Sequence, residues 1–404
     1  MNEPKSTNAG ALADLRVLEL GTLIAGPFCG QLLGDMGAEV IKIEAPGQGD
    51  PMRQWGPQPR GKPSVWWPVI GRNKKGITLD LRQVEGQKLF KDLVVKADIV
   101  IENFRPGTLE KWGCGWSELS RLNPRLILVR VSGYGQTGPY AQRAGYGGIG
   151  EAMGGLRYIV GEPDRPPSRV GISIGDSLAA VHACMGTLAA LHHRERTGCG
   201  HVIDAAIYES VLNMMESLVT EFDQLGHVRE RSGPILPRIA PSNVYLSSDE
   251  QWVVIAANHD TLWRRLATIM GQPELGEDER FATHHARGEH EDLLDEIIGA
   301  FAARHTAQEL DEIVNGGGVV CAPVYTAKDV YEDPYFRERE LLVEYEDEVH
   351  GRISAQGIVP KLSSTPGRVR QAARWTVGAD TEAVLEELGV ERDELDALRE
   401  AGVV

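Results

Sequence analysis

"LRVLELGTLIAGPFCGQLLGDMGAEVIKIE", residues 15–44, is the stretch that decides the fold. A strand pattern at 15–20 is followed by a turn at Gly21, a helical stretch from about Gly26 to Met36, and a second strand pattern at 38–44. Both strand patterns are apolar enough to be covered on two faces, which is typical of parallel strands. The stretch therefore predicts a β-strand–helix–β-strand unit.

The same alternation continues along the chain. Further strands are predicted at 76–81, 98–104 and 125–133, with a helix through QKLFKDLVVKA between the first two. This order predicts an α/β fold with a doubly wound sheet. A helix of small residues is expected from Ser177 to Arg194, and 201–222 reads as a second long helical stretch that could begin as a strand.

A smaller module is predicted in the second half of the chain. The proline-rich segment 232–243 has the composition of a linker, and a strand at 251–257 and several amphipathic helices follow it up to about residue 330. The C-terminal segment predicts two short helices, with Thr381 as an N-cap and Gly389 as a helix stop.

Charge and cysteine content limit the classes of partner. Lysine and arginine number 42 against 58 acidic residues, a formal net charge of −16. Nucleic acids and anionic membranes are bound through basic surfaces, so neither is an expected partner. The five cysteines are scattered without a CxxC pair, the histidines lack metal-ligand spacing, and the N-terminus resembles no signal peptide. No apolar run reaches the roughly 18 residues of a membrane span. We therefore expect a cytoplasmic protein without a bound metal.

Two basic segments are candidates for binding an anionic ligand. GRNKKG at 71–76 precedes a predicted strand, and ENFRPGTLEKWG at 102–113 adds Arg105 and Lys111 at a strand end. Such segments are either solvated turns or cradles for phosphates. Gly21, Gly26 and Gly30 lack GxGxxG spacing, so the first turn does not predict a nicotinamide site.

Asp176 and two glycine-rich segments are candidates for the chemistry. SGYGQTGPY at 132–140 and AQRAGYGGIGEAMGG at 141–155 are suited to places where the backbone closely approaches something else. Asp176 falls in the first turn of the small-residue helix, where it could be an N-cap or a carboxylate nucleophile held by the helix N-terminus. The sequence alone leaves both roles open.

Several stretches taken together resemble the family III (class III) CoA-transferases. They are 15–44, RNKKGITLDL at 72–81, ADIVIENFRPGTLEKWG at 97–113, SGYGQTGPY, 151–180 and the LREAGVV ending. The resemblance implies a Rossmann-like large domain built from 1–225 and 336–404, with a smaller α+β domain at 226–335. It also implies an interlocked homodimer in which each subunit is threaded through the other.

The resemblance also assigns roles to residues. Asp176 matches the catalytic aspartate, and the SGYG turn and the following glycines fall beside the thioester. Residues assigned to CoA are Arg72, Asn73, Lys74, Lys75, Asn103, Phe104, Arg105, Lys111, Gly133, Tyr134 and Gly135. Those assigned to the acyl group or acid are Tyr146, Gly147, Gly148 and Arg238. No permanently bound cofactor is implied, because coenzyme A enters as part of the acyl-CoA substrate.

The mechanism implied by the resemblance is a ping-pong exchange through an aspartyl anhydride and an aspartyl-CoA thioester. Succinyl-CoA as donor and a small dicarboxylic acid such as malate, citramalate or mesaconate as acceptor are favoured, and a shift of CoA between two carboxylates of one acid is an alternative. Related α-methylacyl-CoA racemases carry a His-Asp pair where this chain has Tyr146 and Gly147, so racemization is the second hypothesis. The glycine run of formyl-CoA transferases is reduced to Gly233, which argues against oxalate or formate as acceptor.

Overall fold

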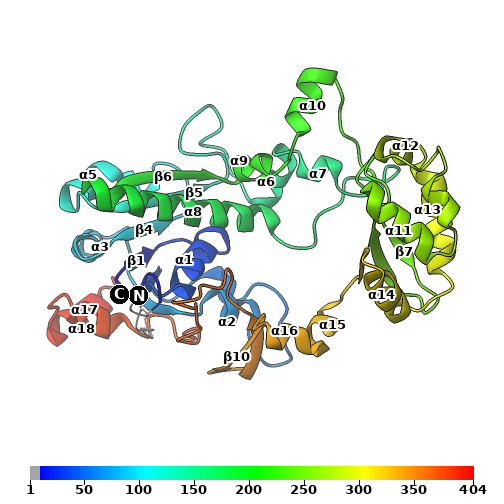
Figure 1. Ribbon diagram of the computed structural model, residues 1–404. Coiled ribbons are helices and arrows are strands. Elements are labelled where there is room, and N and C mark those ends of the chain that lie inside the picture. The colour runs from blue at the N-terminus through cyan, green and yellow to red at the C-terminus, as the bar shows by residue number, and fades with distance from the viewer. Residues whose placement is uncertain (1–9) are drawn as a thin grey trace, which may run out of the picture. The chain divides into compact units, whose positions relative to one another are not determined.

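The computed structural model describes residues 10–404, which form two compact units (Figure 1). Unit 1 comprises the described residues up to Leu156 together with Val170–Val219 and Tyr335–Val404. Unit 2 comprises Arg157–Arg169 and Thr220–Pro334. The main part of the smaller unit begins at Thr220, whereas the family resemblance suggested residue 226. The smaller unit also includes Arg157–Arg169, which was expected in the large domain.

Unit 1 is built on a six-stranded sheet in the order β3-β2-β1-β4-β5-β6. Every neighbouring pair is parallel. The strands are β1 (Arg16–Glu19), β2 (Glu39–Glu44), β3 (Lys74–Thr78), β4 (Ile99–Glu102), β5 (Ile127–Ser132) and β6 (His201–Ala206). The strand order reverses between β1 and β4, which is the point where doubly wound sheets bind ligands at the carboxyl ends of their strands. The predicted α/β fold is confirmed.

The two faces of this sheet are covered by different helices. Leu18, Ile41 and Ile77 belong to one core cluster, which also contains side chains of α3 (Val84–Val95), α5 (Trp116–Leu122), α17 (Thr381–Glu386) and α18 (Arg392–Glu400). Val17 and Val40 belong to the opposite cluster, with side chains of α1 (Ala25–Asp35) and α8 (Ile174–Thr197). Consecutive strand residues therefore alternate between two buried layers, which explains the continuously apolar strands.

The remaining helices of unit 1 are short. They are η1 (Pro51–Arg53), α2 (Trp66–Ile70), α4 (Thr108–Lys111), α6 (Gly147–Met153) and α9 (Ile207–Asn213). Three others, α7 (Leu156–Ile159), α10 (Leu218–Leu225) and α16 (Pro334–Glu338), contain three of the four boundaries between the units.

Helix α8 has the length and composition of a membrane span, contrary to the sequence-based expectation. It is the one helix in the described part of the chain to meet that test, and 44% of its apolar window is buried. Ala179, Ala180 and Ala183 belong to the same core cluster as side chains of α1 and β5. The small, apolar composition of α8 is thus explained by close packing on the sheet, as in the core helices that share this composition.

Three local predictions were wrong. Strand β3 begins at Lys74, so the two lysines form the start of the strand and do not lie in a turn. Residues 201–222 do begin as a strand, β6, but they continue as α9 and the start of α10 instead of one long helix, and Glu216 between the helices has a positive φ of 49°. Thr381 is the first residue of α17, and its hydroxyl accepts a hydrogen bond from the backbone N–H of Thr78 at 3.0 Å.

The C-terminal segment returns to the sheet of unit 1. It contains the antiparallel hairpin β10 (Leu342–Asp347) and β11 (Gly351–Gln356), followed by an extended connection to α17. The Asn73 side-chain oxygen accepts the backbone N–H groups of Arg370 at 2.6 Å and Gln371 at 3.2 Å, which attaches this connection beside β3. The N–H of Asp80 donates to the carbonyl of Val403 at 2.8 Å.

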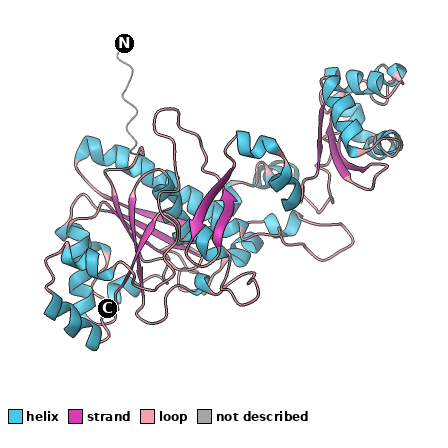
Figure 2. Cartoon of the chain, turned by 90° about the horizontal axis from the view of Figure 1, so that it is seen from below, coloured by secondary structure: helices cyan, strands magenta, loops and turns pink. Residues whose placement is uncertain are grey.

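Unit 2 has its own core. Its antiparallel sheet, in the order β7-β8-β9, consists of β7 (Ser242–Leu246), β8 (Trp252–Ala256) and β9 (Val320–Pro323) (Figure 2). Its helices are α11 (Asp260–Ile269), η2 (Pro273–Gly276), α12 (His284–Glu289), α13 (Glu291–Ala302), α14 (Ala307–Gly316) and α15 (Ala327–Glu332). Val253 and Ile255 of β8 share a buried cluster with Trp263, Phe281 and Leu310.

Candidate active site

Asp176 lies at the start of α8, as the third residue of the helix. The N-cap, Ser173, makes no side-chain capping hydrogen bond, and Asp176 is the acidic residue of the first turn. A helix N-terminus carries a partial positive charge, which stabilises a carboxylate placed there. The side chain is half-buried. A helix start of this kind suits a carboxylate, and the protein covers the side chain only in part.

Gly147 provides the space that the Asp176 carboxylate occupies. A Cβ atom on Gly147 would collide with that carboxylate, and a Cβ on Gly175 would lie 2.8 Å from the Gly147 carbonyl oxygen. A Cβ on Gly150 would collide with Ile207, the residue that follows β6. The start of α6 thus packs without side chains against the starts of α8 and α9. This contact places Asp176 near the carboxyl edge of the sheet.

The SGYG turn leaves the sheet at the same edge. Gly133 follows β5, and a Cβ on it would lie 2.7 Å from the Cα of Gly145. Gly135 has a positive φ of 82°, a conformation that favours glycine. The Tyr134 ring lies 6.1 Å from the ring of Tyr208. Gly133, Tyr134 and Gly135 are therefore brought close to the segment that holds Gly147, as the sequence suggested.

Asn103 holds the turn between β1 and α1. Its side-chain oxygen accepts the Thr22 N–H at 2.9 Å, and its amide donates to the Thr22 carbonyl at 2.8 Å. A Cβ on Gly21 would lie 3.4 Å from the same oxygen. The Asn103 side chain is thus engaged within the protein at the point where the strand order reverses, and it fixes the shape of the turn there.

A buried set of charges lies beneath this turn. The Lys42 ammonium lies 2.9 Å from Glu19 and 2.8 Å from Asp50, and it donates to the Gly21 carbonyl at 2.8 Å. Lys74 lies 2.7 Å from the other oxygen of Glu19 and donates to the Pro27 carbonyl at 2.6 Å. Burial lowers the pKa of Lys42, but Glu19 and Asp50 outweigh it, and the net pKa is raised. For Lys74 burial dominates and the pKa is lowered.

A cavity of about 280 Å³ opens at the carboxyl edge, where β1, β2 and β4 end. Phe104 and Trp112 line it and meet edge to face, with ring centroids 5.3 Å apart. Leu79, Leu81 and Arg82 line it from the segment after β3. The Arg82 side chain is 72% exposed and is oriented by Asp80, 2.8 Å away. The cavity thus combines an aromatic wall with an accessible cation.

Glu102, the last residue of β4, supports this wall from below. Its carboxylate accepts the Phe104 N–H at 2.7 Å and the Arg130 Nε–H at 2.6 Å. Burial raises the pKa of Glu102 to about 7, although Arg130 acts in the opposite direction.

The basic segment Arg72–Lys75 lies at the opposite edge of the sheet, because it leads into the amino end of β3. Arg72 and Asn73 are buried and hydrogen-bond to Asp35, and Lys74 is buried as well. The interpretation of this segment as a solvated turn is therefore wrong for these three residues. Lys75 is half-exposed and lies 2.5 Å from Glu39. The backbone of these four residues thus lies away from Asp176, although the Lys74 ammonium reaches Glu19 beneath the β1–α1 turn. Their contact with CoA stays a prediction.

The other candidate residues are more exposed. Tyr146 is 65% exposed at the N-cap of α6 and is followed by Gly147 and the half-buried Gly148. Arg105 and Lys111 are exposed around α4. Arg238 lies in unit 2, where it has a positive φ of 66° and its backbone N–H donates to Glu291 at 3.0 Å. Within residues 10–404 no group of three or more His, Cys, Asp and Glu side chains could hold a metal ion.

Comparison with known proteins agrees with this arrangement. The family model for CoA-transferase family III matches residues 12–381. The chain belongs to CoA-transferase family III.

Relatives of this family III CoA-transferase match over nearly its whole length. It is 55% identical over 397 residues to succinyl-CoA–D-citramalate CoA-transferase from Chloroflexus aurantiacus, which covers 97% of this chain and 98% of that protein. It is 40% identical to the succinyl-CoA–L-malate CoA-transferase beta subunit from the same organism, with 99% of each chain covered. A crystal structure of a CAIB/BAIF family protein from Brucella suis superposes with a TM-score of 0.82 at 32% identity, covering 94% of this chain and 100% of that one.

Sequence reasoning on this family III CoA-transferase missed part of the carboxyl-edge cavity. Leu79, Leu81, Arg82 and Trp112 were not candidates, although they share the cavity with Phe104. Arg82 is a single cation four residues after β3, without a motif around it. Its position after the carboxyl end of a predicted strand could have marked it as a candidate, because the carboxyl ends of all parallel strands lie on one edge of the sheet, where ligands bind.

Proposed function

We propose that this enzyme transfers coenzyme A from succinyl-CoA to a small dicarboxylic acid of the citramalate or malate type. The observation that carries the proposal is the position of Asp176. Its carboxylate lies at a helix N-terminus and packs against Gly147 at the carboxyl edge of the sheet. The choice of substrates is supported by the relatives named for succinyl-CoA and D-citramalate or L-malate.

The proposed first half-reaction uses the Asp176 carboxylate as nucleophile. One of its oxygens attacks the thioester carbonyl carbon of succinyl-CoA, the carbon–sulfur bond breaks, and CoA leaves as thiolate. The products are a succinyl–aspartyl anhydride and the thiolate. The thiolate then attacks the aspartyl carbonyl, succinate leaves, and an aspartyl-CoA thioester remains.

The second half-reaction is the reverse sequence with the acceptor acid. The acceptor carboxylate attacks the aspartyl-CoA thioester and releases CoA thiolate, which gives an acceptor–aspartyl anhydride. The thiolate attacks the acceptor carbonyl, and the Asp176 carboxylate is regenerated. No proton or electron is gained or lost, so the reaction needs neither a base nor a redox cofactor.

Stabilisation of the oxyanions is the main requirement of this chemistry. Backbone N–H groups at the starts of α6 and α8 are suited to it, because the first N–H groups of a helix have no partner within the helix. Gly147 and Gly175 allow these two helix starts to approach each other. A negatively charged intermediate can therefore be stabilised without additional charged side chains.

We place the nucleotide part of CoA in the carboxyl-edge cavity. Phe104 and Trp112 offer an aromatic surface for the adenine, and Arg82 offers a cation for a phosphate. Arg105 and Lys111 are exposed beyond the same strand end and could add charge along the CoA. Asn103 then acts by positioning the turn and Phe104 by direct contact.

Racemization is not supported by the geometry around Asp176. Inversion at the α-carbon needs a base on each face of the substrate, and related racemases supply one from a His-Asp pair. At the two matching positions this chain has Tyr146 and Gly147, so it supplies neither the imidazole nor the carboxylate of that pair.

The mechanism is tested with Asp176→Asn, which keeps the size of the side chain but removes the nucleophilic oxygen. We expect loss of at least about 10³-fold in kcat with an unchanged fold and retained CoA binding. Borohydride or hydroxylamine added during turnover should modify only Asp176 in the wild type. The matched control is Asp14→Asn, at an exposed position of unit 1. Transfer at wild-type rate in Asp176→Asn contradicts the mechanism.

The substrates are tested separately by mass spectrometry of acyl-CoA products from a panel of donors and acids. Succinyl-CoA with citramalate or malate should give the fastest transfer. Isotopically labelled free acid distinguishes transfer between molecules, which puts the label into the new thioester, from a shift between two carboxylates of one acid, which leaves it out.

We further propose that the enzyme works as a homodimer. Val181, Met185 and Leu188 of α8 are 50%, 61% and 39% exposed and lie at i, i+4 and i+7, so they form one apolar face of the helix. Exposed apolar surface of this kind is typical of interaction sites. The family resemblance supports a second copy of the chain as its partner.

A further inference from the structure

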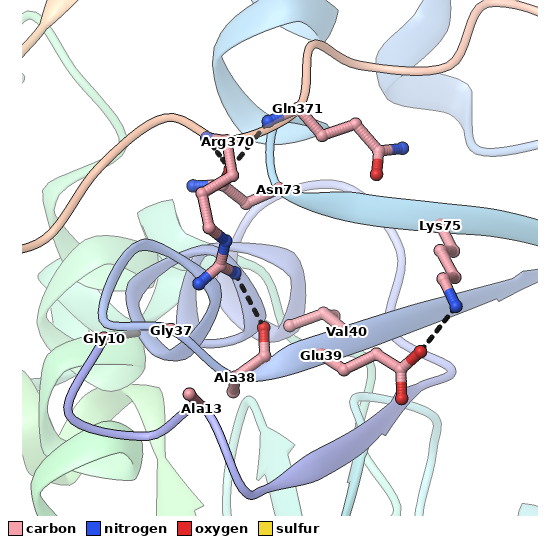
Figure 3. A pocket seen from close by; sticks show the side chains of 10 residues that line it. All are labelled: Gly10, Ala13, Gly37, Ala38, Glu39, Val40, Asn73, Lys75, Arg370 and Gln371. Carbon is pink, nitrogen blue, oxygen red and sulfur yellow. Dashed lines mark hydrogen bonds and ion pairs between the residues drawn. The ribbon is translucent and has the colours of Figure 1, made fainter. Parts of the chain in front are cut away.

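A second cavity lies at the amino edge of the unit 1 sheet, where β2 and β3 begin (Figure 3). Its volume is about 470 Å³. Ala38 and Glu39 line it at the start of β2, Asn73 and Lys75 at the start of β3, and Arg370 from the C-terminal connection. These strands begin at the edge opposite to Asp176, so this cavity is distinct from the candidate active site.

Arg370 brings a positive charge to this cavity. One terminal nitrogen of its guanidinium donates to the carbonyls of Gly34 at 2.8 Å and Ala38 at 3.0 Å, and Figure 3 shows the side chain reaching across to Ala38. Within residues 10–404 no carboxylate forms an ion pair with this guanidinium. Burial lowers the pKa of Arg370, although the negative charge of Asp35 acts in the opposite direction. Arg370 as a whole is exposed, and its side-chain hydrogen bonds go to carbonyl oxygens, so the guanidinium retains donors and charge for an anion.

Lys75 supplies a second cation from the neighbouring strand. Its ammonium lies 2.5 Å from Glu39 and 3.7 Å from Glu387. The Lys75 and Glu39 side chains are 34% and 30% exposed, and such partly exposed pairs contribute little stability. Lys75 can therefore turn toward a ligand at a low energetic cost. The charged side chains lining the cavity are two cations and one carboxylate.

Asn73 fixes the geometry of the cavity. Its side chain accepts the N–H groups of Arg370 and Gln371 and donates to Asp35 at 2.7 Å. The backbone of Arg370 is thereby attached to the start of β3, while its side chain extends into the cavity (Figure 3). The cation is thus held in place before a ligand arrives, which reduces the entropy lost on binding.

We propose that this cavity is an anion-binding site for a small molecule carrying a carboxylate or phosphate group, bound by Arg370 and Lys75. The planar guanidinium matches the geometry of both groups, and the ammonium adds a point charge. The site binds its ligand independently of CoA, because it lies at the other edge of the sheet; Lys75 then serves the anion in place of the CoA contact that the family resemblance implies. A bound anion joins β3 to the C-terminal connection and therefore stabilises the folded chain.

The experiment measures thermal unfolding and calorimetric binding of the full chain with inorganic phosphate, succinate or chloride at constant ionic strength. We expect phosphate or succinate, but not chloride, to raise the Tm and to bind with a measurable Kd. Arg370→Gln and Lys75→Gln should each weaken Kd by about tenfold or more, as loss of one charge-assisted hydrogen bond predicts. Arg121→Gln, which removes an exposed charge from α5, is the matched control. The difference between the phosphate and succinate arms identifies the preferred group.

Competition with CoA makes the proposal falsifiable even if Arg370→Gln is unstable. Saturating CoA should leave the Kd for the anion unchanged. Displacement of the anion by CoA, or a Kd that neither variant alters, overturns the proposal, because the anion would then bind elsewhere. These readouts do not depend on transferase activity, so they stand apart from the proposed reaction.

Discussion

At the scale of single residues, the missing side chain of Gly147 is as important as the carboxylate of Asp176. The Asp176 carboxylate packs against the backbone of Gly147, and a Cβ at position 147 would collide with the carboxylate. Catalytic geometry of this kind tolerates little displacement, since a shift of about 1 Å can cost about 10²-fold in rate.

Gly147→Ala should therefore lower kcat by about 10²-fold while changing the KM for succinyl-CoA by less than about threefold. The added methyl group displaces Asp176, the proposed nucleophile, but leaves the carboxyl-edge cavity untouched. Steady-state kinetics with Gly171→Ala as control isolates the effect, because a Cβ at Gly171 meets no atom within 4 Å. Wild-type kcat in Gly147→Ala would show that the carboxylate is not held by this contact.

Glu102 makes stability depend on pH near neutrality. Burial raises its pKa to about 7 from an ordinary value of 4.5, so between these values the folded protein holds a proton that the unfolded chain has lost. Stability from this group is fully present below pH 4.5 and falls as the pH rises to 7, by roughly 3 kcal/mol.

Glu102→Gln should remove this dependence, and the free energy of unfolding should fall less steeply between pH 5 and 7 than in the wild type. Urea unfolding at several pH values measures the difference, with exposed Glu85→Gln as control. Parallel pH profiles of wild type and Glu102→Gln would mean that Arg130 keeps Glu102 ionised in the folded protein.

At the scale of elements, the edge at which a strand begins or ends decides what its residues can do. Arg72–Lys75 have the composition of a phosphate site but lie at the amino end of β3, whereas Arg82 lies beyond its carboxyl end. Only Arg82, of these residues, lines the cavity that contains Phe104 and Trp112.

Arg82→Ala should raise the KM for succinyl-CoA by about tenfold and leave kcat nearly unchanged, because a phosphate contact binds substrate and transition state alike. The KM increase should shrink at high salt, since the side chain is 72% exposed. Lys88→Ala, at an exposed position of α3, is the control. An unchanged KM would show that the nucleotide part of CoA does not bind in this cavity.

Strands with only apolar buried residues were predicted more accurately from the sequence than a strand such as β3, which begins with a buried charged residue. The strands of the sheet were visible because residues such as Leu18 and Val100 continue the apolar pattern on both faces. The start of β3 was missed because Lys74 looks solvated, yet its charge is balanced by Glu19, which is distant in sequence. The break between α9 and α10 has no glycine or proline to mark it.

For the active site, motifs identified Asp176, Asn103 and Phe104, which lie at the edge where the chemistry is expected. The role of Asn103 in holding the Thr22 turn could not be predicted, because it depends on a contact between β1 and β4. Arg82 and Trp112 could not be predicted for the same reason: they meet only after the strands have been ordered in the sheet.

At the scale of the whole molecule, the proposed dimer gives the exposed face of α8 a partner. Met185→Glu should convert the dimer to a monomer or weaken its dissociation constant by at least about 10²-fold, because a charge would be buried in an apolar contact. Light scattering coupled to size exclusion measures the mass. Val84→Glu, an isolated apolar residue that is 72% exposed, is the control. A dimer of unchanged affinity in Met185→Glu would place the interface elsewhere.

The return of the C-terminal segment to unit 1 affects how the protein is made on the ribosome. Helices α17 and α18 supply side chains to the core beneath β1, β2 and β3, and the carbonyl of Val403 holds the N–H of Asp80. During translation the main part of unit 2, Thr220–Pro334, is therefore synthesised in full before the large unit has all its parts. At roughly 5–20 residues per second, the nascent sheet waits for several seconds with an apolar face incompletely covered. Premature termination anywhere after Pro334 would release a chain with a finished small unit and an unfinished large one, which makes it a substrate for chaperones and proteases.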